Sequence, residues 1–264
     1  MWRESVTGIA DLMRSDLLSS ELEPAPVNTT QWANKGVRIS SDRFDRDELF
    51  QLAEIARTTG DDQKLLQLFW DILAWGVMGN FRNAGRIVDF AATDDGRTRL
   101  LTALRTGATA SHAGKIEDAY RAFVDYKVPR LGPAFFSKVL FFAGDRTSPE
   151  PRCLIFDSRV ESALPTVTGT SYSLVNRPVT TYARYCRDMY AWSQEFGVTP
   201  EAIEARLYQL GKATENSRRA WLSAEVSLYR EGRVPVTFDA ILTRVIRDHR
   251  RTVPADEVPG QGKS

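Results

Sequence analysis

The chain has 264 residues, with 35 Lys and Arg against 34 Asp and Glu and a formal net charge of +1. This length can bury one sizeable core, either as one large domain or as two small lobes around a cleft. The balanced charge gives almost no long-range attraction to nucleic acid, so affinity for phosphate has to come from local basic patches. Its first turns contain charges, and no run approaches the roughly 20 apolar residues that cross a bilayer. We therefore expect a cytoplasmic protein without membrane contact.

Cysteines and histidines are too few and too scattered for several kinds of site. Cys153 and Cys186 lie far apart without a CxxC pattern, which argues against zinc and iron–sulfur sites and favours buried free thiols. His112 and His249 lie among polar residues, without a ligand partner at helical spacing. These patterns predict no metal and no cofactor, and they give little support to a serine-hydrolase triad.

Helical periodicity dominates the chain, and strand patterns are sparse. Residues 45–60 place their apolar side chains on one stripe and end at Gly60, a typical helix stop. Residues 61–79 begin with acidic side chains at the positive end of the helix dipole and are apolar enough for a buried helix. Further helices are predicted at 82–92, 95–106, 115–126, 133–143, 158–164, 179–196, 199–211, 215–230 and 237–250. The pattern predicts an all-α protein.

The predicted organisation has three parts. Residues 1–46 form an N-terminal helix and an extended connection, because 21–46 are rich in Pro, Asn, Thr and Gly. Residues 47–251 form the main helical domain, with a surface loop at 166–178. Residues 252–264 lack apolar anchors and are expected to form a disordered tail.

The most informative segment is a pair of predicted helices, 115–126 and 133–143, joined by a tight connection. Pro133 at the first helical position has a preset φ, and Gly132 is expected to let the backbone turn sharply. Free backbone amides at that helix start, with Lys127 and Arg130 beside them, predict a site for a DNA phosphate. The predicted DNA-binding residues are Lys127, Arg130, Leu131, Gly132, Pro133 and Ala134.

Downstream, the buried apolar run CLIF leads to Asp157 at the mouth of a new helix. A carboxylate beside a sugar can stabilise the positive charge that develops as an N-glycosidic bond breaks, and it can orient an attacking water. The commoner role of an Asp at this place is helix N-capping. Both interpretations remain open from the sequence.

A family resemblance rests on these two features. The pattern LGPAFFSKVLFFAG followed by LIFDSRV resembles the helix-hairpin-helix motif and downstream catalytic aspartate of the DNA glycosylase superfamily, especially bacterial proteins with the 8-oxoguanine DNA glycosylase fold. The stretches WGVMGNFRNAGRI and RDMYAWSQEFGVTPEAIEARLYQLG resemble the same proteins, so the similarity spans roughly residues 45–212. It implies an all-α helix-hairpin-helix glycosylase fold, with helical lobes around a central cleft. It also implies a monomer that acts on duplex DNA with an extruded nucleotide.

Lys138 is the second candidate catalytic residue. In the bifunctional members that the chain resembles, a lysine of the second hairpin helix attacks the sugar, and Asp157 follows Lys138 at the separation those members show. Alignment on Gly132 instead puts the lysine position at Ala134, which implies a monofunctional enzyme that uses water and Asp157. Ala134 and Lys138 share a helix face. The place of the hairpin glycine is geometrically harder to change than the length of a loop, so alignment on Gly132 is preferred and the sequence favours hydrolysis. Catalysis by Lys138 stays open. The ordinary alternative for Lys138 is a place on a solvated helix face.

Four residues are candidate walls of a base pocket: Trp75, Arg82, Phe135 and Phe136. A flipped base needs an aromatic or apolar slot, which one of Phe135 and Phe136 can supply. The ordinary alternative for the aromatic residues is burial in the core. For Arg82 the alternative is solvated helix surface.

The resemblance implies a glycosylase for a damaged or modified base. Some similar proteins are anti-phage glycosylases that remove glucosylated hydroxymethylcytosine. The alternatives are a non-catalytic helix-hairpin-helix module that binds DNA for another enzyme, and a regulatory helical protein without a nucleic-acid role. Salt-sensitive retention on DNA argues against the last of these.

Overall fold

A computed structural model of the chain describes residues 8–14, 24–77 and 81–230, with side chains as far as Asn216. These residues form eleven helices and one pair of two-residue strands, which confirms the all-α prediction. The elements are α1 (Ile9–Arg14), β1 (Ala25–Pro26), α2 (Thr29–Ala33), β2 (Arg43–Phe44), α3 (Arg46–Thr59), α4 (Asp62–Val77), α5 (Phe81–Ala91), α6 (Asp94–His112), α7 (Ile116–Asp125), α8 (Pro133–Ala143), α9 (Ser158–Thr168), α10 (Pro178–Phe196) and α11 (Pro200–Arg230). No helix in these ranges is both long and apolar enough to span a bilayer.

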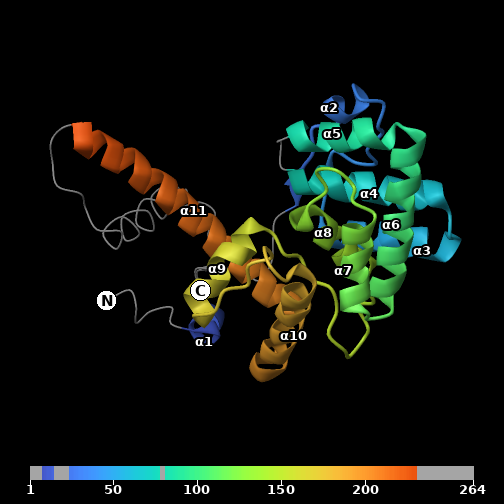
Figure 1. The fold of residues 1–264 in the computed structure, drawn as a ribbon. Coiled ribbons are helices and arrows are strands. Elements are labelled where there is room, and N and C mark those ends of the chain that lie inside the picture. The colour runs from blue at the N-terminus through green and yellow to red at the C-terminus, as the bar shows by residue number, and fades with distance from the viewer. Residues whose placement is uncertain (1–7, 15–23, 78–80, 231–264) are drawn as a thin grey trace, which may run out of the picture.

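The helices form two groups (Figure 1). Helices α2 to α8 lie together on one side, and α1, α9, α10 and the long α11 lie on the other. Packing of α10 against α7 joins the groups, and α1 packs against α9, α10 and α11 although it comes first in the chain. The predicted glycosylase features, on α8 and at the start of α9, therefore lie where the chain passes from one group to the other.

Local sequence explains most helix ends. Asp45 forms a capping box with Glu48 at the start of α3, and Gly60 ends that helix in the left-handed conformation, as predicted. Pro133 occupies the first turn of α8 and Pro200 that of α11, where a missing N–H costs nothing.

Several predicted boundaries were wrong. The helices predicted at 199–211 and 215–230 are one helix, α11, because Gly211 is a packing residue and not a stop. Helix α9 continues through Pro165 to Thr168, so the loop predicted at 166–178 begins later. Helix α6 extends to His112. The helix predicted at 237–250 and the tail at 252–264 lie outside the described residues.

The connection predicted at 21–46 contains α2 and the antiparallel pair β1–β2. Buried Asp71 of α4 holds this segment in place: its Oδ1 accepts from the Ser40 backbone N–H (2.9 Å), and its Oδ2 accepts from the Ser40 hydroxyl (2.7 Å). Burial raises the pKa of the Asp71 carboxyl, and the Ser40 hydrogen bonds partly offset this. Trp32 of the same segment lies in the core. The part of 21–46 that the structure describes thus belongs to the main core.

Helix α11 passes very close to the first turn of α9. A Cβ built on Gly211 would lie 2.1 Å from the Arg159 carbonyl oxygen and 2.6 Å from its carbonyl carbon. Backbone cannot yield as a flexible side chain can, so any side chain at position 211 has to separate the two helices.

We therefore expect Gly211→Ala to lower the free energy of unfolding by about 1–3 kcal/mol, although alanine is the better helix former by about 1 kcal/mol. Chemical denaturation measures the change. Gly132→Ala is the matched control, because a Cβ there meets no atom within 4 Å and its φ of −83° suits any residue. A Gly211→Ala variant as stable as the control would contradict the close helix crossing.

Candidate active site

The hairpin between α7 and α8 contains two residues in strained backbone conformations and is held by one arginine. Lys127 and Arg130 have positive φ angles of 46° and 67°, which non-glycine residues rarely adopt. Arg99 of α6 donates to the carbonyl oxygens of Tyr126 (2.9 Å) and Lys127 (2.6 Å) and so fixes the first of these turns. Arg99 is not recognisable as a hairpin residue from the sequence, because it lies 28 residues from Lys127.

The expectation that Gly132 makes the sharp turn was wrong. Gly132 is the N-cap of α8 in ordinary extended conformation (φ −83°, ψ 174°), because Lys127 and Arg130 already supply the left-handed turns. Nothing in the described residues hydrogen-bonds the backbone N–H groups of Gly132 and Ala134. These amides at a helix start, with no side chain on Gly132 to cover them, have the geometry of an anion site.

The six predicted DNA-binding residues are therefore adjacent, but they differ in exposure. Lys127 and Arg130 are exposed, whereas the side chain of Leu131 is buried and anchors the hairpin to the core. Pro133 and Ala134 are partly exposed.

Lys138 lies inside the protein and faces Asp157. Its Nζ is 3.7 Å from Asp157 Oδ2 and donates to the Ala134 carbonyl oxygen at 2.7 Å. The side chains of Lys138 and Asp157 are 9% and 15% exposed. A solvated helix face is thus the wrong interpretation of Lys138, and the structure brings the two predicted catalytic residues together.

The segment that carries Asp157 is extended but pairs with no strand. Its buried backbone is satisfied by side chains: Tyr182 donates to Leu154 O and Tyr185 to Ile155 O, each at 2.8 Å. The backbone N–H of Phe156 donates to Ser137 Oγ of α8 at 3.0 Å. These bonds fix Asp157 relative to both α8 and α10. These bonds could not be predicted locally, since the two tyrosines lie 28 and 30 residues from their partners.

Asp157 uses its two carboxylate oxygens differently. Oδ1 accepts from the backbone N–H groups of Arg159 (3.0 Å) and Val160 (3.1 Å) and caps α9. Oδ2 is the oxygen that faces Lys138. The capping interpretation is confirmed, and it leaves one charged oxygen available for chemistry.

Burial and nearby negative charge act in opposite directions on the pKa of Lys138. Burial lowers the pKa of the Lys138 ammonium, while the negative charges of Asp157 and Glu204 oppose this shift. Glu204 of α11 is 1% exposed, and its Oε2 accepts from Arg46 Nη2 of α3 at 2.6 Å. Burial raises the pKa of Glu204 although Arg46 lowers it. The sequence analysis missed this pair, because nothing local distinguishes either residue.

The predicted base-pocket residues are dispersed. Phe136 is buried and stacks on Phe123 with ring centroids 5.0 Å apart, so it is a core residue and cannot receive a base. Phe135 is partly exposed, and Arg82 is exposed on α5. Trp75 is partly buried, with its ring edge-to-face against Phe142.

Gly76 of α4 lies against the aliphatic part of Lys138. A Cβ there would be 3.1 Å from Lys138 Cδ and 3.7 Å from Phe135 Cδ1. Gly76 thus lies between Phe135, a predicted pocket residue, and the Lys138 side chain, and it leaves the space that this side chain occupies.

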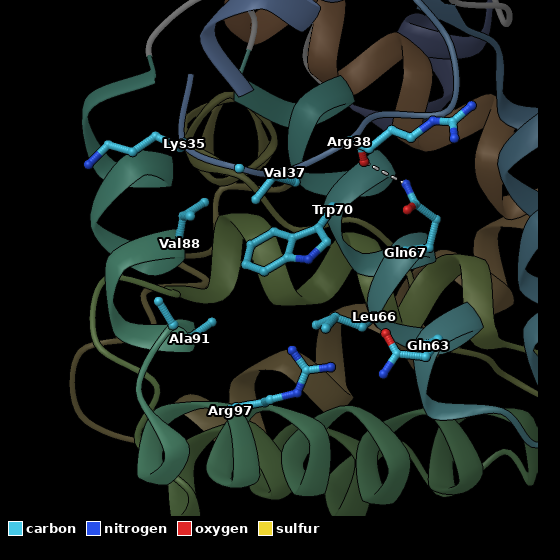
Figure 2. Close-up of a pocket in the computed structure, with 12 residues that line it drawn as sticks. Lys35, Val37, Arg38, Gln63, Leu66, Gln67, Trp70, Val88, Ala91 and Arg97 are labelled. Carbon is cyan, nitrogen blue, oxygen red and sulfur yellow. Dashed lines mark hydrogen bonds between the residues drawn. The ribbon is translucent and has the colours of Figure 1, made fainter. Parts of the chain in front are cut away.

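A hollow of about 270 Å³ lies elsewhere, between the Lys35–Arg38 loop, α4, α5 and α6. Figure 2 shows Trp70 and Arg97 on its wall, with the side chains of Lys35 and Arg38 pointing away. Lys35 is paired with Asp89 at 2.7 Å. This hollow contains none of the predicted site residues. No group of three or more metal-ligating side chains occurs in the described part of the chain.

A family model described as "Putative 8-oxoguanine DNA glycosylase OGG-like protein" matches residues 13–208. The chain belongs to this OGG-like family. Searches of curated proteins and of solved structures found no match. The family match covers the hairpin, Lys138 and Asp157, and it assigns the OGG-like protein to a DNA glycosylase class whose substrate is DNA.

The two roles of Asp157 can be separated by stability measurements. Both Asp157→Ala and Asp157→Asn remove the buried counter-ion of Lys138. Beyond that shared loss, we expect Asp157→Ala to lower the free energy of unfolding by about 1–2 kcal/mol more than Asp157→Asn, whose amide oxygen still caps α9. Thermal and chemical denaturation measure both. Asp45→Ala, which removes the α3 cap far from Lys138, is the control for an ordinary cap loss. Equal losses for Asp157→Asn and Asp157→Ala would contradict the capping role of Oδ1.

Proposed function

We propose that this OGG-like protein is a DNA glycosylase that binds duplex DNA as a monomer, extrudes a damaged or modified nucleotide and breaks its N-glycosidic bond. The observation that carries the proposal is the Lys138–Asp157 pair, whose charged atoms are 3.7 Å apart and largely shielded from water. Lys138 lies on α8, the helix that follows the hairpin, and Asp157 caps α9. A buried lysine with a lowered pKa beside a carboxylate is frequent at active sites.

In the proposed reaction Asp157 acts on the sugar. As the base departs with the bonding electrons and gains a proton, positive charge develops on the deoxyribose. Oδ2 of Asp157, which does not take part in the α9 cap, stabilises that charge. The low polarity around the pair strengthens this interaction compared with water.

Lys138 is the proposed nucleophile. Its Nζ attacks C1′ as the C1′–base bond breaks. The C1′–O4′ bond then breaks, one proton of the amine passes to O4′, and a protonated imine joins Nζ and C1′. Attack requires the neutral amine, and burial lowers the pKa of Lys138 toward that form. The sequence alone favours hydrolysis; the position of Lys138 supports the bifunctional reaction instead. Water activated by Asp157 is the alternative.

The hairpin is proposed to hold the strand. The free amides of Gly132 and Ala134 bind one phosphate, and exposed Lys127 and Arg130 add charge beside it. The base remains to be found by experiment. Glucosylated hydroxymethylcytosine and a role in anti-phage defence are proposed only from the resemblance.

The first test incubates the protein with duplexes that carry oxidised, alkylated, deaminated and phage-modified bases, followed by mass spectrometry of released bases. On the active substrate we expect Asp157→Asn to slow release by about 100-fold or more while DNA binding persists. Borohydride should trap a covalent complex that Lys138→Gln abolishes and that Lys115→Gln, a change at an exposed lysine, leaves intact.

Heat-dependent strand breakage without trapping would establish the water mechanism. Full activity of Asp157→Asn would refute its assigned role. No released base from any duplex, together with DNA binding, would favour the non-catalytic binding module.

The second test concerns the hairpin. We expect Lys127→Gln and Arg130→Gln each to weaken DNA binding and to reduce the slope of log affinity against log salt by about one. Fluorescence anisotropy over a salt series measures both. Arg121→Gln on α7, an exposed residue that pairs with Asp118, is the control.

Gly132→Ala should weaken binding without loss of stability, because the added methyl group crowds the phosphate and no protein atom. Unchanged salt slopes in the lysine and arginine variants would place the DNA elsewhere.

A further inference from the structure

A buried ion pair lies next to the proposed catalytic residues but has no part in the reaction described above. Arg46 at the start of α3 binds Glu204 near the N-terminal end of α11, with side chains 19% and 1% exposed. The pair thereby connects the two groups of helices. The Arg46 guanidinium also lies 5.3 Å from the ring centroid of Phe141, one turn after Lys138 on α8.

We infer that Arg46 and Glu204 form a positioning pair for the reaction, holding α3 and α11 together beside α8 and balancing the charges of Lys138 and Asp157. The inference rests on the proposed function. Without the pair, Asp157 would be the one charged group left among those that act on Lys138. With it, the site contains two positive and two negative groups from four elements.

The surroundings of Lys138 support this arrangement. The charged groups that act on it are Asp157 at the α9 cap, Glu204 from α11 and Arg46 from α3. Tyr185 of α10 and Tyr208 of α11 lie among the same charges, and burial raises the pKa of each phenol, so both remain neutral. Helix α4 contributes Gly76, which has no charge.

Glu204 is the main hydrogen-bond partner of the Arg46 guanidinium. The Arg46 Nε is buried and has no hydrogen-bond partner in the described part of the protein, so the bond from Nη2 to Glu204 is the principal polar contact of Arg46. Removing only the carboxylate would leave an unpaired cation near Lys138, which disfavours the protonated amine. Removing both charges together avoids that penalty.

The chain contains a matched control pair. Glu201, also on α11, forms an ion pair with Arg152, and the two side chains are 17% and 15% exposed. Arg152 Nε lies 3.0 Å from Glu201 Oε1. Neither residue is among the charges that act on Lys138. Breaking this pair therefore measures the loss of stability from a largely buried ion pair of α11, without a change in the charges that act on Lys138.

The experiment measures the pH dependence of Lys138 in two ways, in wild type, Glu204→Gln, Arg46→Met/Glu204→Gln and Glu201→Gln. NMR of isotope-labelled lysine in the DNA-free protein, assigned with Lys138→Arg, gives the titration of the amine. Borohydride trapping across pH, each variant normalised to its own plateau, gives the reactivity.

For Glu204→Gln we expect both curves to move to lower pH, with relative trapping on the acid side faster by roughly three- to tenfold. The double variant should lie between Glu204→Gln and wild type, because Glu204 acts on Lys138 more strongly than Arg46 does. Glu201→Gln should not move either curve. A pair that is only structural would lower stability and total activity and leave the curves in place.

A folded Glu204→Gln whose two curves coincide with wild type would overturn the inference. If Glu204→Gln does not fold, the double variant decides. Curves with midpoints at or above the wild-type midpoints overturn the inference, and curves with lower midpoints support the inference. Failure of the proposed function is distinguishable, because wild type would then trap no DNA while the NMR titration still decides whether the pair controls the charge of Lys138.

Discussion

The structure depends on two opposite charges held almost out of water where its two groups of helices meet. Desolvating an ammonium and a carboxylate is costly, and a separation of 3.7 Å recovers only part of that cost. The remainder is met by hydrogen bonds to the same groups: Ala134 O accepts from Lys138, and two α9 amides donate to Asp157. Burial lowers the pKa of a lysine so placed, and an aspartate so placed has a fixed direction. The arrangement that makes the pair expensive to bury also makes it reactive.

Rigidity at this site comes from side chains that hold the backbone. Tyr182, Tyr185 and Ser137 take the place of neighbouring strands for the segment before Asp157, so an irregular segment is positioned as firmly as a sheet would position it. The hairpin differs, since it stores strain in Lys127 and Arg130 and is held by Arg99. Strain of this size persists only where the surroundings determine it, and such positions are frequent at binding sites. The segment before Asp157 and the hairpin are thus held by different side chains, and both adjoin α8.

Sequence could predict what is encoded locally. Pro133 after Gly132 marks the start of α8, Asp157 marks a helix cap, and the apolar run before it marks burial. The sequence could not predict that Gly211 is a packing contact, because a glycine near a helix end has the same pattern as a stop. Nor could it identify Glu204 and Arg46, which are 158 residues apart and meet only in the folded chain. Phe135 and Phe136 are neighbours of equal hydrophobicity, and only the packing of α8 against Phe123 shows which of them is buried.

The buried pair also bears on the choice between an enzyme and a binding module. A module that only grips DNA needs the hairpin amides and its cations. It could have an apolar residue at position 138 and an uncharged capping residue at position 157 without loss of stability, since burying an ion pair is often no better than burying uncharged groups. The charges at these two positions are therefore poorly explained by stability. They lie one turn from the start of α8, where the proposal places a DNA phosphate and the extruded sugar, and they include the Asp157 oxygen that does not cap α9. Catalysis accounts for both the cost and the location of the pair, whereas DNA binding accounts for neither.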